Sequence, residues 1–303
     1  MTALHRSTRK LPAFAAALPP LLFAVLLAAT LLPALPAAAA SGDSAMQLRY
    51  QPFQILLTRH LEEKALPEGG LSSAFDYAAA LAADDTGVLL EEQARRLAKF
   101  DPALLTTRDE AVAFWVNAYN FFMLAHILEN PQRGDLVDSV RDYGNLFNPY
   151  RVFRQDLFDI GGQDYSLDEM EKGILLGDDF ASRGWKDARV HFAVNCASVG
   201  CPPLRQDVYL PSTLDAVLTD STRRALNTRR HLHLEGTTLH LTSLFDWYAS
   251  DFAEEEGSVT DFIAAYADEN VREKLRQHQQ VRFIDYDWSL NRPANFPEFS
   301  AGR

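Results

Sequence analysis

The sequence predicts an α+β fold that is predominantly helical and contains a small central sheet. Three observations support this class. Apolar residues recur at helical spacing over most of the chain, and the predicted helix at 111–129 is apolar almost all round. Short extended runs flanked by glycine predict a few strands. After the first forty residues there is no internal repeat and no long linker, so the remainder reads as one large domain or two small ones.

The first forty residues predict a signal peptide. A basic stretch ending at Lys10 is followed by an apolar run, with small residues at Ala38 and Ala40. Prolines such as Pro19 and Pro33 interrupt the run, which disfavours a retained membrane-spanning helix. We therefore expect cleavage near Ala40, export to the periplasm or the outside of the cell, and no stable membrane span afterwards.

The chain is acidic. Its 41 acidic and 29 basic residues give a formal net charge of −12. Loss of residues 1–40 removes three basic residues and no acidic ones, which shifts the charge to −15. A surface of this sign repels phosphate backbones, so we expect no nucleic-acid partner.

We divide the chain into a signal peptide at 1–40, an N-terminal helical part at 41–106, a core domain at 107–291 and a tail at 292–303. The predicted helices lie at 47–66, 75–83, 89–100, 111–129, 167–176, 213–227, 243–252, 258–267 and 271–278. The predicted strands form hairpins at 156–165 and 231–241, a central strand at 188–195 and a last strand at 281–286.

The helix predicted at 111–129 is a buried polar helix. Thr107 and Glu110 form a capping box at its start. Asn117 and Asn120 interrupt its apolar surface three positions apart, which places both amides on one face. Buried amides usually tie down a neighbouring loop, and we favour that interpretation. The alternative is that they line a site and orient a catalytic group or a ligand.

Cys196 and Cys201 are the only cysteines in the sequence, and they lie in the stretch HFAVNCASVGCPPL. In an exported protein we favour a disulfide between them, which would stabilise the fold by about 2 kcal/mol. Three alternatives stay open: Cys196 as a nucleophile, packing alone, and metal binding, the last being weak for two isolated thiols.

His191 is the candidate base closest in sequence to Cys196. On the predicted strand at 188–195, the odd spacing would send the two side chains to opposite faces unless the strand ends early. A papain-like or transglutaminase-like site would then take its histidine from elsewhere and use Asn117 or Asn120 to orient it. A histidine on a central strand is also simply a hydrogen-bonded core residue.

A second histidine group is expected on the hairpin at 231–241. With the turn at Gly236, His233 faces His240 across the two strands, and His231 shares their face. Three imidazoles on one face can ligate zinc or copper. The alternative for these residues is an exposed polar face.

Several separated motifs, taken together, are specific enough to indicate a family. In chain order they are FWVNAYN at 114–120, Gly161-Gly162, Ser166-Leu167 with Glu171, DARVHFA at 187–193, Cys196-Ala197-Ser198 with Cys201-Pro202 and Leu204, Trp247-Tyr248 with Asp251-Phe252, and YDW at 286–288. This pattern resembles the family catalogued as domain of unknown function 547. The resemblance implies a compact α+β domain of bacterial exported proteins, also used as a module in plant and animal proteins, with no established reaction.

Two positions depart from the family pattern: Ala188 stands where proline is usual, and no basic residue lies near Leu176. Because Glu171 falls within a motif of the resemblance, we weight it above Asp168 as an acid, base or cation ligand. The alternative is that both carboxylates belong to a solvated helix face.

The sequence lacks the motifs of the commoner enzyme classes. It has no G-x-x-x-x-G-K, no G-x-G-x-x-G after a strand, no H-E-x-x-H and no G-x-S-x-G. We therefore expect no cofactor, and a binding or scaffolding module for a protein or small-molecule ligand. The alternative is a thiol hydrolase or acyltransferase with Cys196 as nucleophile and His191 or a later histidine as base.

Overall fold

The computed structural model describes residues 42–300, so the predicted signal peptide at 1–40 lies outside the described residues. Helices predominate, with short strands between them, which confirms the predicted fold class. The α-helices are α1 (Gly42–Arg49), α2 (Gln51–His60), α3 (Tyr77–Ala82), α4 (Thr86–Ala98), α5 (Arg108–Glu129), α6 (Arg151–Arg154), α7 (Asp178–Ser182), α8 (Leu214–Leu226), α9 (Leu244–Trp247), α10 (Ala249–Glu256), α11 (Val259–Tyr266), α12 (Glu269–Gln277) and α13 (Pro297–Ser300).

The strands form small separate sheets rather than one central sheet. They are β1 (Leu61–Ala65), β2 (Leu71–Phe75), β3 (Phe158–Ile160), β4 (Gln163–Tyr165), β5 (Leu232–Glu235), β6 (Thr238–Thr242) and β7 (Gln280–Ile284). The pairs β1–β2 and β3–β4 are antiparallel hairpins, and β6 is the middle strand of a third sheet, antiparallel to β5 and parallel to β7. The predicted hairpins at 156–165 and 231–241 and the last strand are confirmed.

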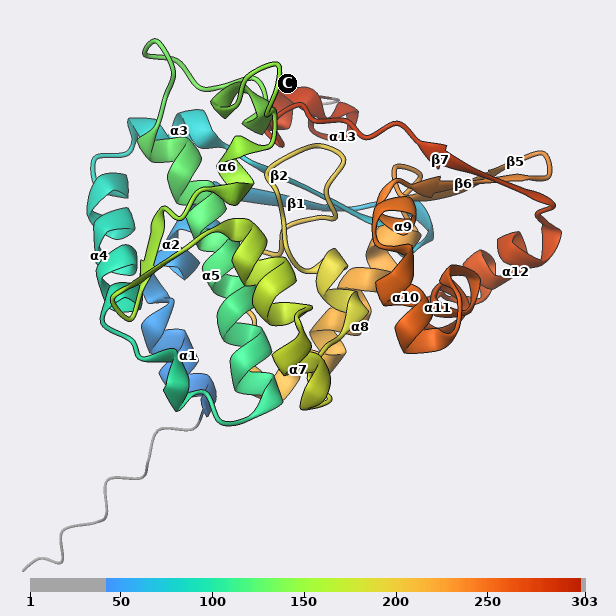
Figure 1. Ribbon diagram of the computed structural model, residues 1–303. Helices are drawn as coiled ribbons and strands as arrows, with labels where there is room; N and C mark the ends of the chain where they lie inside the picture. The colour runs from blue at the N-terminus through green and yellow to red at the C-terminus, as the bar shows by residue number, and fades with distance from the viewer. Residues whose placement is uncertain (1–41, 301–303) are drawn as a thin grey trace, which may run out of the picture. The chain divides into compact units, whose positions relative to one another are not determined.

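Helix α5 is the central element of the fold (Figure 1). It begins as predicted, with the Thr107 hydroxyl oxygen accepting from the backbone N–H of Glu110. Residues 111–125 are all buried, and α1, α2 and α4 contribute to the same apolar core. Within the described residues, α5 is also the one helix long and apolar enough to cross a membrane, and 94% of its apolar window is buried in the protein.

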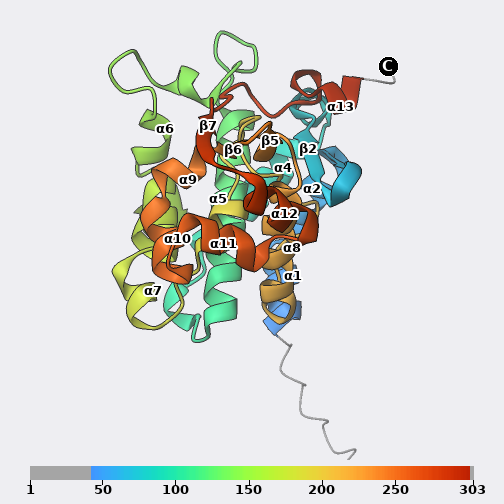
Figure 2. The same cartoon turned by 90° about the vertical axis from the view of Figure 1, so that its right-hand side faces the viewer.

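A second apolar core lies beside the first. It joins Phe192 and Leu226 to residues of β5, β6 and the helices α9 to α12, with Phe245, Phe252 and Phe262 at its centre. Figure 2 shows α10, α11 and α12 across the front of this region, with β5, β6 and β7 above them. The helix predicted at 243–252 is divided at Tyr248 into α9 and α10.

The prediction of one helix over 47–66 is wrong in two places: the helix is divided at Tyr50 into α1 and α2, and it does not extend beyond His60. Helix α2 ends at His60 and the chain continues as β1, because β2 offers a fully buried partner strand and a turn at 66–70 reverses the chain. The backbone N–H of Leu66 donates to the carbonyl of Gly70 across that turn. Tertiary pairing here overrides the local helical preference of the exposed Glu-Glu-Lys stretch.

The predicted central strand at 188–195 is also wrong. Ala188–Phe192 is a 3-10 helix, capped by the Asp187 side chain, which accepts from the backbone N–H of Arg189. The Arg189 guanidinium is buried against Asp187 and Asp215. The run carries apolar residues on more than one side because it lies between the two cores: Val190 packs in the first core and Phe192 in the second.

Candidate functional site

A cavity of about 530 Å³ opens between the two cores. Its walls come from α5, α6, the π-helix Glu169–Leu175, the 3-10 helix at Ala188–Phe192, the cysteine segment, α9 and the segment after β7. Of the predicted site residues, it brings together His191, Glu171, Cys196 and Cys201. Asn117 and Asn120 do not line it, although Tyr119 of the same helix does.

His191 lies at the base of the cavity between two carboxylates. Its side chain is 1% exposed; Nε2 lies 2.9 Å from Oδ2 of Asp251, and Nδ1 lies 3.6 Å from Oε1 of Glu171. The latter distance exceeds that of a hydrogen bond, and Nδ1 has no hydrogen-bond partner. The ring stacks on Tyr248 with centroids 4.0 Å apart. The imidazole is thus held rigidly, with one nitrogen turned to the Glu171 side.

The two carboxylates also determine the charge of His191. Burial disfavours the imidazolium, but the hydrogen bond to Asp251 and the neighbouring Glu171 outweigh burial and raise the pKa of His191. The same hydrogen bond lowers the pKa of Asp251, and Lys186, whose Nζ lies 3.0 Å from Asp251 Oδ1, adds to this effect. The arrangement therefore favours a buried imidazolium beside an ionised aspartate.

Both predicted carboxylates lie at the start of the π-helix Glu169–Leu175, with Asp168 just before it and Glu171 in its first turn. At its start, the Ser166 hydroxyl oxygen accepts from the backbone N–H of Glu169. Asp168 is held by Lys172, with Nζ 2.8 Å from Oδ1, and by Arg154 at 3.6 Å. Glu171 is buried and Asp168 half-buried. Neither carboxylate therefore lies on the fully solvated helix face that was the alternative.

Cys196 and Cys201 form the predicted disulfide, with their sulfurs 2.18 Å apart. Both sulfurs border the cavity. The Tyr286 hydroxyl lies 3.1 Å from Cys196 Sγ and 3.0 Å from Cys201 Sγ, and Ser198 Oγ lies 3.1 Å from Cys196 Sγ. Because the segment at 188–192 is not a strand, the face argument against a shared site for His191 and Cys196 does not apply.

Asn117 and Asn120 make the hydrogen bonds expected of the structural interpretation. The Asn117 amide donates to the Tyr209 carbonyl at 2.8 Å and accepts from the Tyr209 N–H at 2.9 Å. The Asn120 amide donates to the Ala193 carbonyl at 3.0 Å and accepts from the Asn195 N–H at 2.8 Å. Both side chains therefore fasten neighbouring segments to α5, and Asn120 fastens the segment that carries the cysteines.

Aromatic rings form the mouth of the cavity. The Trp247 and Trp288 rings are nearly parallel, at 21° with centroids 6.0 Å apart, and Tyr286 packs against both. Tyr150 lies 5.1 Å from Trp288 on the other side. Trp247 is 45% exposed, an unusual state for a large apolar ring that contacts other rings.

Sequence reasoning missed Asp251 and these aromatic residues as site residues. The available signal was weak: Trp247-Tyr248, Asp251 and the YDW motif all lie in the pattern of the resemblance, without an assigned role. Asp251 also lies four positions after Trp247, which suits one helical face. Nothing in the sequence indicates that these segments meet His191.

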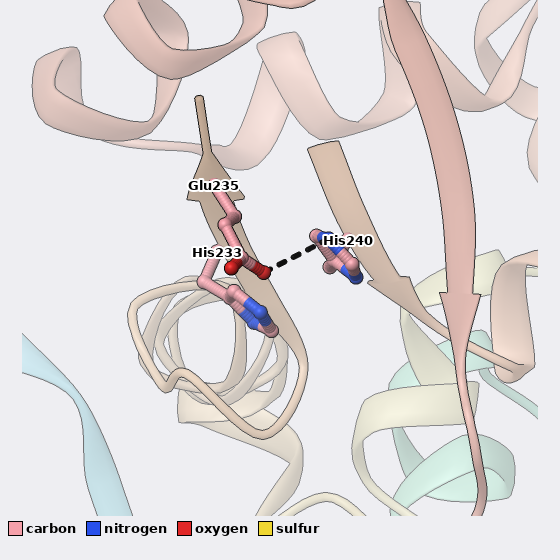
Figure 3. A group of neighbouring side chains, drawn as sticks. All are labelled: His233, Glu235 and His240. Carbon is pink, nitrogen blue, oxygen red and sulfur yellow. Dashed lines mark ion pairs between the residues drawn. The ribbon is translucent and has the colours of Figure 1, made fainter. Parts of the chain in front are cut away.

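The hairpin histidines lie outside the cavity. His233 and His240 pair across β5 and β6 as predicted. His231, the third histidine of the predicted group, lies just before β5 with its ring buried, where burial lowers its pKa to about 3, and it is not among the residues whose ligand atoms lie close together. Glu235 takes its place beside the other two histidines (Figure 3).

Comparison with known proteins supports the family over part of the chain and gives no information on activity or ligand. Residues 103–225 match the model of a family described as protein of unknown function, DUF547. No curated protein and no solved structure matches the chain. The resemblance carried by the motifs is thus confirmed over this segment, while the domain boundaries at 41–106, 107–291 and 292–303 stay predictions.

Proposed function

Starting from a chain whose residues 103–225 match DUF547, we propose an exported binding module whose cavity holds a small carbohydrate. The observation that carries the proposal is the cavity of about 530 Å³, which joins an aromatic mouth to a base of fixed polar groups. Binding sites for small molecules are typically concave, mostly apolar, and furnished with a few placed polar groups.

The aromatic mouth supports a ligand with flat faces. Trp247 is partly exposed and lies almost parallel to Trp288, so a ring-shaped ligand could cover the open indole face without moving the other rings. Aromatic side chains bury a large area at low cost in conformational entropy, and the C–H faces of a sugar ring offer matching apolar surface.

The polar groups that line the cavity support a neutral, hydroxylated ligand rather than a charged one. The carboxylates Asp168 and Glu171 are balanced by Lys172, Arg154 and the imidazole of His191. Donors and acceptors are therefore both present with little net charge. A sugar hydroxyl both donates and accepts hydrogen bonds, so it can satisfy either kind of group.

The thiol hydrolase alternative has one observation in its favour: Cys196 and His191 border the same cavity, and Asp251 orients the imidazole. Against it, the disulfide to Cys201 leaves no thiolate to act as nucleophile. Mass measurement after alkylation, with and without prior reduction, counts the free thiols of the purified protein. A free Cys196 that reacts with iodoacetamide at acidic pH would favour the hydrolase.

The binding proposal is tested by calorimetric titration of the protein with chitotriose, cellotriose and maltotriose, with tryptophan fluorescence as a second readout. We expect one of the three to bind, and Trp247→Ala to weaken its binding at least about tenfold. Trp185→Ala is the matched control, because Trp185 is also partly exposed but lies outside the cavity.

Two results would overturn the carbohydrate proposal. Absence of binding by all three trisaccharides is one. Binding of benzyltrimethylammonium instead is the other, because it would identify the mouth as a cage for organic cations. Export is tested separately: expression of the full chain in a bacterial host should yield a periplasmic or secreted protein whose N-terminus lies near residue 41.

A further inference from the structure

The β5–β6 hairpin carries a group of side chains suited to a metal ion. One nitrogen each from His233 and His240 and one oxygen from Glu235 all lie within 4.8 Å of one another. Figure 3 shows the three side chains on the same side of the hairpin, with His240 Nε2 and Glu235 Oε2 joined by an ion pair of 3.6 Å. None of the three lines the aromatic cavity.

The register of the hairpin brings these residues together. His233 pairs with His240, and Glu235 with Thr238, around a turn in which Gly236 has φ 61°. Side chains directly opposite each other in an antiparallel pair are neighbours on one face. The imidazole rings accordingly lie parallel, at 4° with centroids 4.6 Å apart.

The orientation of His233 suits a ligand. Its Nδ1 lies 2.9 Å from the Arg229 carbonyl, so Nδ1 carries the proton and Nε2 keeps its lone pair. Metal-bound histidines usually donate their other N–H in this way, which fixes the tautomer and the direction of the ring.

We propose that His233, Glu235 and His240 bind one divalent transition-metal ion of the zinc type. Bond lengths near 2.1 Å place tetrahedral ligand atoms about 3.4 Å apart, so donors that lie up to 4.8 Å apart must approach each other by up to about 1.4 Å. Glu235, whose side chain is 80% exposed, is free to make that movement. Three protein ligands leave a fourth position for water or for another ligand.

Arg282 tunes the site. It pairs with His240 across the parallel β6–β7 ladder, and paired residues share a face of the sheet. Its positive charge therefore opposes a bound cation. Removal of this charge in Arg282→Gln should strengthen metal binding, whereas removal of a ligand should weaken it. Stronger binding in Arg282→Gln together with weaker binding in a variant that lacks a ligand would distinguish a metal site from non-specific attraction of cations to the acidic surface.

The experiment is calorimetric titration of the tag-free, chelator-treated protein with ZnCl₂ at neutral pH. We expect one equivalent to bind. His240→Gln should weaken binding at least about tenfold, and His233→Gln/His240→Gln should abolish it. His278→Gln is the matched control, because His278 Nδ1 also contacts a backbone carbonyl, that of Leu275, but the ring lies outside the group. It should bind zinc as the unaltered protein does.

A second readout does not depend on heats of binding. Addition of Co²⁺ should give the visible absorption of a site with nitrogen and oxygen ligands, and zinc should raise the thermal midpoint of the unaltered protein but not of the double variant. Circular dichroism without metal checks that each variant folds. The proposal is overturned if zinc at about 1 mM produces no saturable binding, or if the double variant binds as well as the unaltered protein.

Discussion

His191 Nε2 lies 2.9 Å from Asp251 Oδ2, although the two residues are 60 positions apart in the chain. The contact joins the 3-10 helix that lies between the two cores to α10 of the second core. Together with the stacking of the imidazole on Tyr248 and the facing carboxylate of Glu171, this hydrogen bond orients a buried titratable group of the cavity.

Asp251→Asn should destabilise the protein more at acidic than at alkaline pH. The pKa of His191 is raised in the folded state, so its protonation contributes stability that is fully present below the unfolded value of about 6.5 and is lost as pH rises through the higher folded value. We expect a loss of about 2 kcal/mol at pH 6 and a smaller loss at pH 9, measured by urea unfolding.

Glu254→Gln is the control for this substitution, because Glu254 is the other, exposed carboxylate partner of Lys186. Its effect should stay within about 0.5 kcal/mol. An equal loss at both pH values for Asp251→Asn would mean that the charge of His191 contributes nothing to stability.

Asn120→Ala should be among the more destabilising polar substitutions. It leaves the Ala193 carbonyl and the Asn195 N–H buried without partners, which costs roughly 3 kcal/mol. The free energy of unfolding in urea measures this. Asn130→Ala removes an exposed amide that bonds only to His126 of its own helix end, and it should cost less than about 1 kcal/mol.

Reduction of the disulfide should lower the free energy of unfolding by about 2 kcal/mol, since Cys196 and Cys201 close a short loop. Chemical unfolding with and without a phosphine reductant gives this difference. The Cys196→Ala/Cys201→Ala variant should be less stable to a similar degree and insensitive to the reductant. If the reductant shifts the double variant equally, its effect does not come from this bond.

The two glycines of the β3–β4 turn should differ in their tolerance of alanine. Both have positive φ, 65° for Gly161 and 81° for Gly162, so each substitution costs about 1 kcal/mol of backbone strain. A Cβ on Gly161 would also lie 2.7 Å from the Phe100 carbonyl oxygen, whereas a Cβ on Gly162 would have no atom within 4 Å. The midpoint of thermal unfolding should therefore be clearly lower for Gly161→Ala than for Gly162→Ala. The reverse order would contradict the packing of this turn on α4.

Local signals in the sequence were sufficient for some elements. The capping box and the continuous apolar surface predicted α5, and the glycine pair predicted the β3–β4 turn. The short cysteine spacing, together with the predicted export, favoured the disulfide. Each of these rests on interactions between residues close in sequence. The sequence also predicted that Asn117 and Asn120 form hydrogen bonds to a neighbouring segment, but it did not identify the partner residues.

Other features depend on tertiary contacts that no local pattern reports. The run at 188–195 carries apolar residues on more than one side because two cores meet there, and a buried strand would show the same pattern. The aromatic mouth is likewise hidden, since Trp247 and Trp288 come from segments separated by β7 and three helices. The meeting of Asp251 with His191 has the same cause.

Asn291 has a consequence for the order of events during synthesis. Its amide joins Tyr77 and Asn195, at 2.7 and 3.1 Å, while its backbone accepts from Phe75 and donates to Ala197. One late residue thus closes the loop that carries both sulfurs onto a strand made more than 200 positions earlier. During synthesis these hydrogen bonds cannot form until residue 291 has been added. The cysteine loop therefore lacks its contacts with Asn291 while most of the polypeptide has already been made.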